Sequence, residues 1–213
     1  MKKQLRLLLL CISIINALQA QTNQIVSAKG AVLDNPYFHV NKDFAGFTSA
    51  NNTNIGTRVI AALDDVVIKS SRGQISLVRG QVSVFLENET YEISSGTYFE
   101  IAFKKDHPPL TLPDQWVEPQ KNTTVYEDAQ FRIFEERLEA GDIRDLHSHA
   151  QRLVVRLNLV QLTDPRLNKE VKEGTGIQVP NTVKFAEPVV HAVKNLSKIP
   201  LFNIVIEFKV KHN

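Results

Sequence analysis

Three blocks of sequence occur twice in this chain, in the same order each time. Residues 32–40 resemble residues 125–133, residues 57–68 resemble residues 151–162, and residues 98–104 resemble residues 203–209. Each block is rich in β-branched and aromatic residues, and turn-forming Gly, Asn, Asp and Pro residues separate the blocks, as in β-strands joined by turns. The repetition predicts two copies of one strand unit, and we expect them to pack face to face.

The chain beyond its N-terminal segment fits an all-β fold. Short strand-like segments follow one another closely, which is typical of a β-sandwich or a closed barrel. The stretch 134–139 has a weak helical period, and its charged residues, Glu135, Glu136, Arg137 and Glu139, indicate a solvated turn. The predicted strands are Arg58–Leu63, Val66–Ile68, Gln81–Phe85, Tyr98–Phe103, Phe131–Phe134, Arg152–Leu157, Leu159–Leu162 and Leu201–Phe208.

The N-terminus has the layout of a secretory signal peptide. Basic residues between positions 2 and 6 precede an apolar run over 7–15, and the small residue Ala20 ends the segment. We therefore expect residues 1–20 to be removed by cleavage after Ala20 and the mature protein to be periplasmic or secreted. The apolar run is too short for a stable bilayer span, so we expect none in the mature form; a signal anchor is the alternative.

The remaining chain divides into two repeats, residues 21–106 and 123–213, and a connecting segment. Four prolines between His107 and Pro119 cannot continue a sheet ladder, so residues 107–122 are predicted to be an ordered linker. With 25 basic and 23 acidic residues, the chain is too balanced to indicate a nucleic-acid partner. Cys11 is the single cysteine and lies in the predicted signal peptide, which excludes a cysteine nucleophile or metal ligand in the mature protein.

Histidines give the clearest chemical signal. His147 and His149 are separated by one residue, so on a strand both side chains point to the same side. His191 would arrive on a later strand and complete three nitrogen ligands for a metal, with open coordination positions left over. Asp145 lies two residues before this pair and Gln151 two residues after it, so on a continuous strand their side chains would point to the same side. Asp145 could orient a ring and Gln151 could add a weak oxygen ligand, unless both are ordinary polar residues at a strand end.

On these residues the second repeat resembles the cupin family. The first cupin motif runs Gly, five residues, His-x-His, three or four residues and Glu. Gly141, His147 and His149 match its beginning, whereas Leu153 and Val154 stand where the glutamate ligand is expected. The second motif ends in Pro-x-Gly-x-x-His-x-x-x-Asn. His191 and Asn195 match it, and two other residues, Ala186 and Pro188, replace its Pro and Gly.

The resemblance implies a bicupin, in which two double-stranded β-helix barrels follow each other in one chain and the first is degenerate. It implies a divalent transition metal, iron, zinc, nickel, copper or manganese, on His147, His149 and His191. An oxygenase-like or isomerase-like enzyme, monomeric or homodimeric, would then act on a small anionic molecule. The alternative is a non-enzymatic ligand-binding or structural cupin with a vestigial site, which the missing glutamate favours.

Two arginines on one strand have two interpretations. Arg152 and Arg156 have the same parity, so both could line the barrel and clamp a carboxylate or phosphate. Alternatively both project into solvent while the leucines and valines between and after them, including Leu159, fill the core. Arg58 stands at the position of Arg152 in the first repeat, where no metal site is visible, and this favours a structural role.

Overall fold

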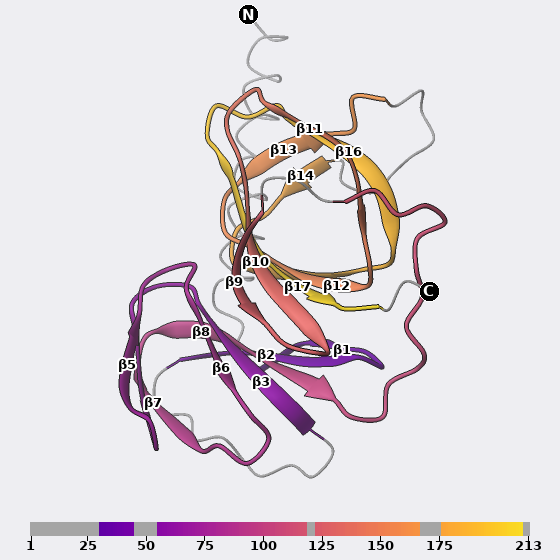
Figure 1. Cartoon of the computed structure of the whole chain (residues 1–213). Helices are drawn as coiled ribbons and strands as arrows, with labels where there is room; N and C mark the ends of the chain where they lie inside the picture. Colours follow the sequence, from indigo (N-terminus) through magenta and orange to yellow (C-terminus); the bar gives the residue numbers. More distant parts are fainter. Residues whose placement is uncertain (1–29, 45–54, 119–121, 167–175, 211–213) are drawn as a thin grey trace, which may run out of the picture.

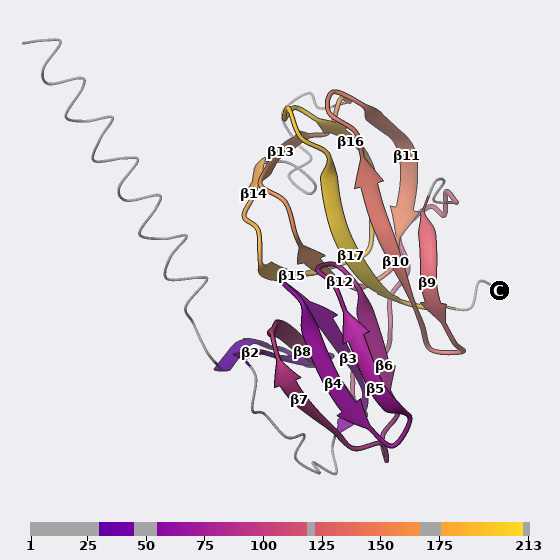
Figure 2. The ribbon, with the colours of Figure 1, turned by 90° about the vertical axis from the view of Figure 1, so that its left-hand side faces the viewer.

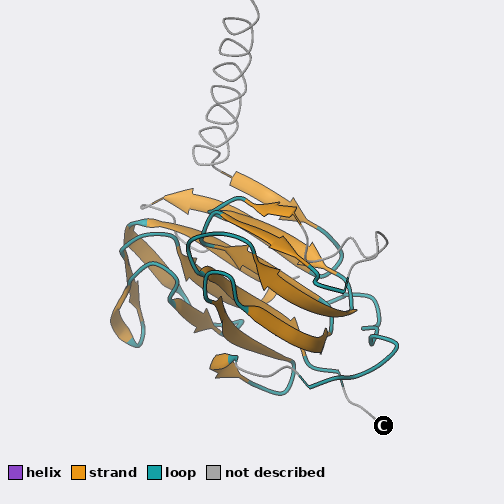
Figure 3. Ribbon diagram, turned by 90° about the horizontal axis from the view of Figure 1, so that it is seen from above, coloured by secondary structure: helices purple, strands orange, loops and turns teal. Residues whose placement is uncertain are grey.

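The described part of this protein is built from β-strands. The computed structural model describes residues 30–44, 55–118, 122–166 and 176–210, and within these ranges no helix is long and apolar enough to cross a membrane (Figure 3). The all-β prediction is confirmed, and the weak helical period at 134–139 is wrong, because most of this stretch lies in strand β10 (Phe131–Leu138). The predicted signal peptide lies outside the described residues.

Within the described residues, the first half of the chain forms eight strands in two sheets (Figure 1). The larger sheet has the order β1-β2-β8-β3-β6, and the smaller sheet has the order β5-β4-β7. The strands are β1 (Gly30–Asp34), β2 (Phe38–Phe44), β3 (Ile55–Ala62), β4 (Val66–Ser70), β5 (Gly73–Leu77), β6 (Val82–Phe85), β7 (Tyr91–Ser95) and β8 (Thr97–Lys104).

The second half also forms two sheets, ordered β15-β12-β17-β10-β9 and β11-β16-β13-β14. Strand β10 continues from Phe131 to Leu138, and a bend at residues 150 and 151 separates β11 from β12. The other strands in the described residues are β9 (Thr123–Glu127), β11 (Ile143–His149), β12 (Arg152–Arg156), β13 (Val160–Thr163), β14 (Gly176–Gln178), β15 (Thr182–Ala186), β16 (Val189–Asn195) and β17 (Leu201–Phe208).

The larger sheets of the two halves have matching strand orders, because β1-β2-β8-β3-β6 corresponds to β9-β10-β17-β12-β15. Their registers also match: Phe38 pairs with Phe103 in the first half, and Phe131 pairs with Phe208 in the second. The same turn precedes both pairs, since Asn35 accepts hydrogen bonds from the next backbone N–H groups just as Asp128 does. The predicted two-repeat architecture is therefore confirmed.

The main hydrophobic core lies between the two larger sheets, which face each other (Figure 2). Every second residue of a strand points into this core because side chains alternate across a sheet. Val59 and Ile101 come from the first half and meet Leu153 and Ile206 from the second; all four are fully buried. Removal of this large apolar surface from water binds the halves into one unit.

The opposite faces of the same sheets line the interiors of the two barrels. The first interior is mostly apolar, with Ile60, Phe85 and Ile93 completely buried, and its buried Glu100 accepts a hydrogen bond from Tyr91. In the second barrel the inward face carries ionisable residues, among them Glu136 with an exposed fraction of 8%. The solvated-turn interpretation is therefore wrong for Glu136, because β10 runs through this position and turns its side chain inward.

The segment 107–118 of the predicted linker is tied to the second barrel by backbone contacts. Ser148 and Val117 exchange hydrogen bonds, with the Ser148 N–H donating to the Val117 carbonyl and the Val117 N–H donating to Ser148 Oγ, both at 2.8 Å. Ser148 Oγ donates in turn to the carbonyl of Gln115. The segment runs along one side of the molecule (Figure 1), against the strand that carries His147 and His149.

Candidate metal centre

The three predicted ligands meet inside the second barrel. Strands β11 and β16 are antiparallel neighbours, and His147 pairs directly with His191. His149 lies two residues further along β11 on the same face, as the His-x-His spacing predicts. The candidate ligand atoms of the three residues all lie within 4.8 Å of one another, and each residue is at most 4% exposed.

Three ring nitrogens of the histidine group have no hydrogen-bond partner in the described part of the chain. His147 Nδ1 donates to the backbone carbonyl of Asp145 at 2.7 Å, which leaves its Nε2 as the lone-pair nitrogen. His147 Nε2 and both ring nitrogens of His191 are buried and have no hydrogen-bond partner among the described residues. Buried polar atoms without partners are rare in proteins. A divalent transition metal accepts such lone pairs, so the donor set fits one.

Burial also keeps the rings in the state that binds metals. It lowers the pKa of His147 and His149 and lowers the pKa of His191 to about 2. Desolvation disfavours the charged imidazolium, and the neighbouring rings and Arg152 oppose a further positive charge at His149 and His191. Neutral imidazoles are the form that coordinates metals, so no proton has to be displaced at neutral pH.

Glu207 of β17 supports His149 from behind, and the sequence reasoning did not identify it. Its carboxylate lies 3.3 Å from His149 Nδ1 and accepts a 2.6 Å hydrogen bond from the backbone N–H of Ala150. Arg132 lies 3.2 Å from the same carboxylate. A carboxylate that accepts the Nδ1 proton of a histidine directs its Nε2 toward a metal. The available signal was a charged residue inside an apolar strand, at a position where the first repeat has Ala102.

Asp145 and Gln151 do not join the histidines. Asp145 contributes its backbone carbonyl rather than its carboxylate, because an irregularity in β11 between Arg144 and His147 breaks the parity. The Gln151 amide donates to Tyr37 Oη and accepts from the backbone N–H of Thr111, so it holds the two halves and the linker together. It differs from the expectation because the chain bends after His149 and enters another sheet.

Arg152 and Arg156 both face the barrel interior, so the solvent-facing interpretation is wrong for both. Arg152 is 4% exposed and donates to the backbone carbonyls of Ala150 and Glu187. Arg58 binds the carbonyl of Glu89 in the first barrel in a similar way, which supports the structural role expected for Arg152. Leu159, expected in the core, is 53% exposed.

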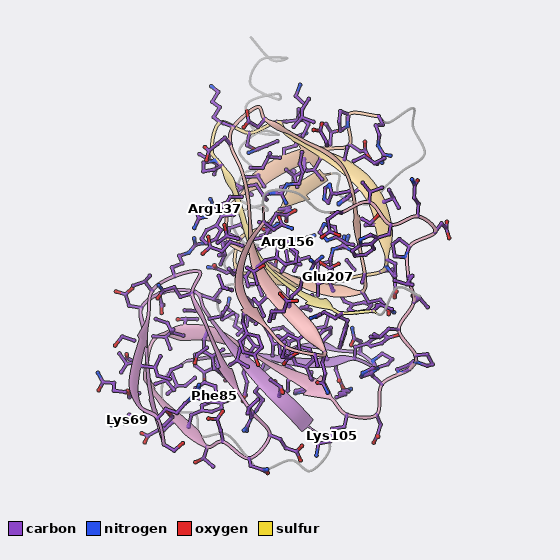
Figure 4. The ribbon with its side chains drawn as sticks, in the orientation of Figure 1. Lys69, Phe85, Lys105, Arg137, Arg156 and Glu207 are labelled. Atoms are coloured by element: carbon purple, nitrogen blue, oxygen red, sulfur yellow. The ribbon has the colours of Figure 1, made fainter. Side chains whose placement is uncertain are left out.

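A cavity opens beside the histidines and has a volume of about 60 Å³. His149 and His191 form part of its wall, and Arg156 lines it from β12, which belongs to the other sheet of this barrel. Figure 4 labels Arg156 in the interior of the molecule. The Arg156 guanidinium has no hydrogen-bond or ion-pair partner among the described residues, and its Nε is buried. Lys184 and Val154 also line the cavity, so the position of the absent cupin glutamate contributes no negative charge.

Comparison with known proteins identifies the fold. No protein-family model matches this sequence, and no curated protein sequence matches it. Among solved structures, a cupin 2 conserved barrel domain protein from Leptotrichia buccalis is 12% identical, covers 88% of this chain and 94% of its own, and has a TM-score of 0.55. An IolB-like protein from Salmonella typhimurium is 7% identical, with coverages of 88% and 92% and a TM-score of 0.58.

A variant of oxalate decarboxylase from Bacillus subtilis is 10% identical, with coverages of 80% of this chain and 68% of its own and a TM-score of 0.50. At these identities the similarity extends to the fold alone. This chain therefore has the bicupin fold, with two cupin barrels in one polypeptide. The expected resemblance to cupins is confirmed at the level of the fold, and the three-histidine group lies in the second barrel.

Proposed function

We propose that this protein is a metal-dependent bicupin enzyme that acts on a small anionic molecule. His147, His149 and His191 would hold one divalent transition metal. The observation that carries this proposal is the convergence of three buried imidazoles, of which His147 and His191 have buried ring nitrogens without partners among the described residues. A structural cluster of histidines would be expected to satisfy these atoms with protein donors or acceptors.

The metal would supply Lewis-acid or redox chemistry at positions that the three histidines leave open. Iron, zinc, nickel, copper and manganese all accept imidazole nitrogen, so the ligand set alone does not choose among them. Oxygenase-like and isomerase-like reactions both suit such a centre. Around it the chain orients His149 through Glu207 and His147 through the Asp145 carbonyl.

The charge of the cavity supports an anionic substrate. Arg156 and Lys184 line it, and its one carboxylate, Glu136, is paired with Arg144 and Asn203. The usual glutamate ligand is replaced by Leu153 in the core between the barrels and by Val154 in the cavity wall. A metal bound by three neutral imidazoles would keep its full positive charge. A carboxylate or another small anion would then be attracted by the metal and by Arg156 together.

Metal content tests the proposal. Residues 21–213, produced without a histidine tag, should contain about one equivalent of a transition metal, as expected of a single three-histidine centre. The variants H147A and H191A should lose it. The control H39A removes a partly exposed histidine in the first half and should retain it. A protein without metal, whose thermal stability none of the five metals changes, would favour the alternative of a non-enzymatic binding cupin.

We also propose that the protein is exported. The basic start, the short apolar run and Ala20 support this, as in other secretory signals. N-terminal sequencing of the protein from the periplasm or medium should begin at Gln21. Recovery of the uncleaved chain from the membrane fraction would instead indicate a signal anchor.

A further inference from the structure

Three polar residues form a row across the floor of the second barrel. Arg156 of β12 is the cross-strand partner of Asn203 of β17, and Asn203 is also the partner of Glu136 of β10. All three line the cavity that His149 and His191 border. Because their side chains point to the same face, a ligand beside the histidines would contact them.

The orientation of the Asn203 amide follows from its neighbour. Glu136 Oε2 accepts a hydrogen bond from Asn203 Nδ2 at 2.9 Å, and Glu136 Oε1 lies 3.5 Å from Arg144 Nη1. Burial opposes ionisation, but Arg144 and the amide hold the pKa of Glu136 below its ordinary value. An ionised carboxylate only accepts hydrogen bonds, so Asn203 must turn its NH₂ toward Glu136 and its oxygen away.

This orientation places a buried hydrogen-bond acceptor, Asn203 Oδ1, beside a buried donor, the Arg156 guanidinium. Asn203 is 1% exposed, and its Oδ1 has no partner among the described residues. Arg156 Nε is also buried without a partner, and Gln178 Oε1 on β14 is a third such atom in the same cavity. Leaving these groups unpaired destabilises the folded protein. In the first barrel the positions of Arg156 and Asn203 are occupied by Ala62 and the fully buried Tyr98, whose hydroxyl group also has no partner among the described residues.

We propose that the cavity binds a short-chain hydroxycarboxylate, whose carboxylate pairs with Arg156 and whose hydroxyl group donates to Asn203 Oδ1. This deepens the proposed function and rests on it for the location of the reacting site. A guanidinium selects a planar carboxylate, and an amide oxygen selects a donor, which simple carboxylates lack. The cavity volume of about 60 Å³ suits a short chain.

Three probes with three carbon atoms each distinguish the carboxylate contact with Arg156 from the hydroxyl contact with Asn203. Glycerate has a carboxylate and hydroxyl groups, propanoate has the carboxylate alone, and glycerol has hydroxyl groups alone. Calorimetric titration of the full mature protein, as purified and again after chelation, should give glycerate at least about tenfold tighter binding than either relative. Equal binding of glycerate and propanoate, or no binding of glycerate, would overturn the hydroxycarboxylate assignment.

Two variants of similar shape test one contact each. R156M should reduce the preference for glycerate over glycerol to near parity. In E136Q, Arg144 holds the new amide oxygen, so the new NH₂ faces Asn203 and turns the Asn203 NH₂ into the cavity. This variant should lose the preference for glycerate over propanoate while still binding both. The exposed R72M is the control and should keep both preferences. If both variants kept them too, the assigned contacts would be wrong.

Metal analysis of the same samples distinguishes the two proposals. If the protein contains metal but shows no preference for glycerate, the proposed function stands and the hydroxycarboxylate proposal is wrong. If the protein prefers glycerate after chelation but never binds metal, the hydroxycarboxylate proposal stands and the proposal of a metal-dependent enzyme is wrong. Both results come from the same preparation, so a folding defect would be visible in each.

Discussion

The larger sheets of the two barrels have the same strand order, but the residues that line the two interiors differ. Where the second barrel has Arg156 and Asn203, the first has Ala62 and the fully buried Tyr98. In the first interior the buried Glu100 is paired with Tyr91 among apolar side chains. The second interior instead combines three histidines with Arg156, whose guanidinium has no partner in the described part of the chain. The comparison indicates that the inward positions of this fold can change their chemistry without changing the strand order.

The faces between the barrels differ much less. Phe38 and Phe131 occupy equivalent places, as do Phe103 and Phe208, and all four belong to one core. A substitution in this shared core affects both halves at once, whereas a substitution in an interior affects one. The first barrel is therefore expected to contribute mainly stability, and the second is expected to exchange part of its stability for binding.

The largest expected effect comes from opening the closed interior. Phe85 is completely buried in the first barrel, at the position that Ala186 occupies in the second. F85A should lower the free energy of unfolding by about 3–5 kcal/mol, because it removes a large side chain and leaves a cavity. Urea denaturation measures this, and metal content should stay unchanged in the folded variant. The neighbour Leu86 is 55% exposed, so L86A should change stability by less than about 0.5 kcal/mol.

The junction between the barrels should respond next. Gly80 has a positive φ of 86°, and a Cβ atom there would lie 2.6 Å from the Phe202 ring of the second half. G80A should lower the free energy of unfolding by about 2–4 kcal/mol, from backbone strain and overpacking together. Gly73 has a φ of 101° and open space around it, so G73A reports the strain alone, about 1 kcal/mol. Equal losses in both variants would show that the Phe202 contact yields without strain.

The sequence predicted the fold because strands alternate regularly within each repeat. The same alternation placed His147 and His149 together, since β11 is continuous between them. The same alternation gave a wrong prediction for Gln151, which does not lie beside the histidines, because the bend after β11 leads the chain into the other sheet. Parity also grouped Arg152 with Arg156, but parity alone does not tell which face of a strand is inside.

The supporting carboxylates could not be predicted from local spacing. Glu207 follows His149 by more than fifty residues along the chain, and β17 reaches the histidine from the other sheet. Glu136 was obscured by a run of neighbouring charges, although its partner residues Arg144 and Asn203 bury it. Such pairs follow from sheet order, which the sequence gives only after the two repeats have been superimposed strand by strand.

A smaller effect is expected from the carboxylate behind His149. E207Q should weaken metal binding by about 10- to 100-fold, equivalent to about 1.4–2.7 kcal/mol, because the amide supports the ring less well. Competition with a chelator measures the affinity. The exposed Glu92 of the first barrel provides the control, and E92Q should leave the affinity unchanged. If E207Q shifted the affinity by less than about threefold, Glu207 would serve the fold through Ala150 and Arg132 rather than the metal centre.

The smallest effect should have the opposite sign and is the most direct test of the difference between the barrels. The Arg156 guanidinium is half-buried without a partner, and burial lowers its pKa, so its charge is held in an unfavourable place. R156M should therefore raise the free energy of unfolding by about 0.5–1.5 kcal/mol while weakening anion binding. The surface variant K69M, which removes an exposed cation of β4, should change stability by less than about 0.5 kcal/mol. A destabilised R156M would mean that Arg156 supports the barrel as Arg152 does. A stabilised R156M would mean that the second barrel maintains an unpaired charge for its ligand, as the closed first barrel does not.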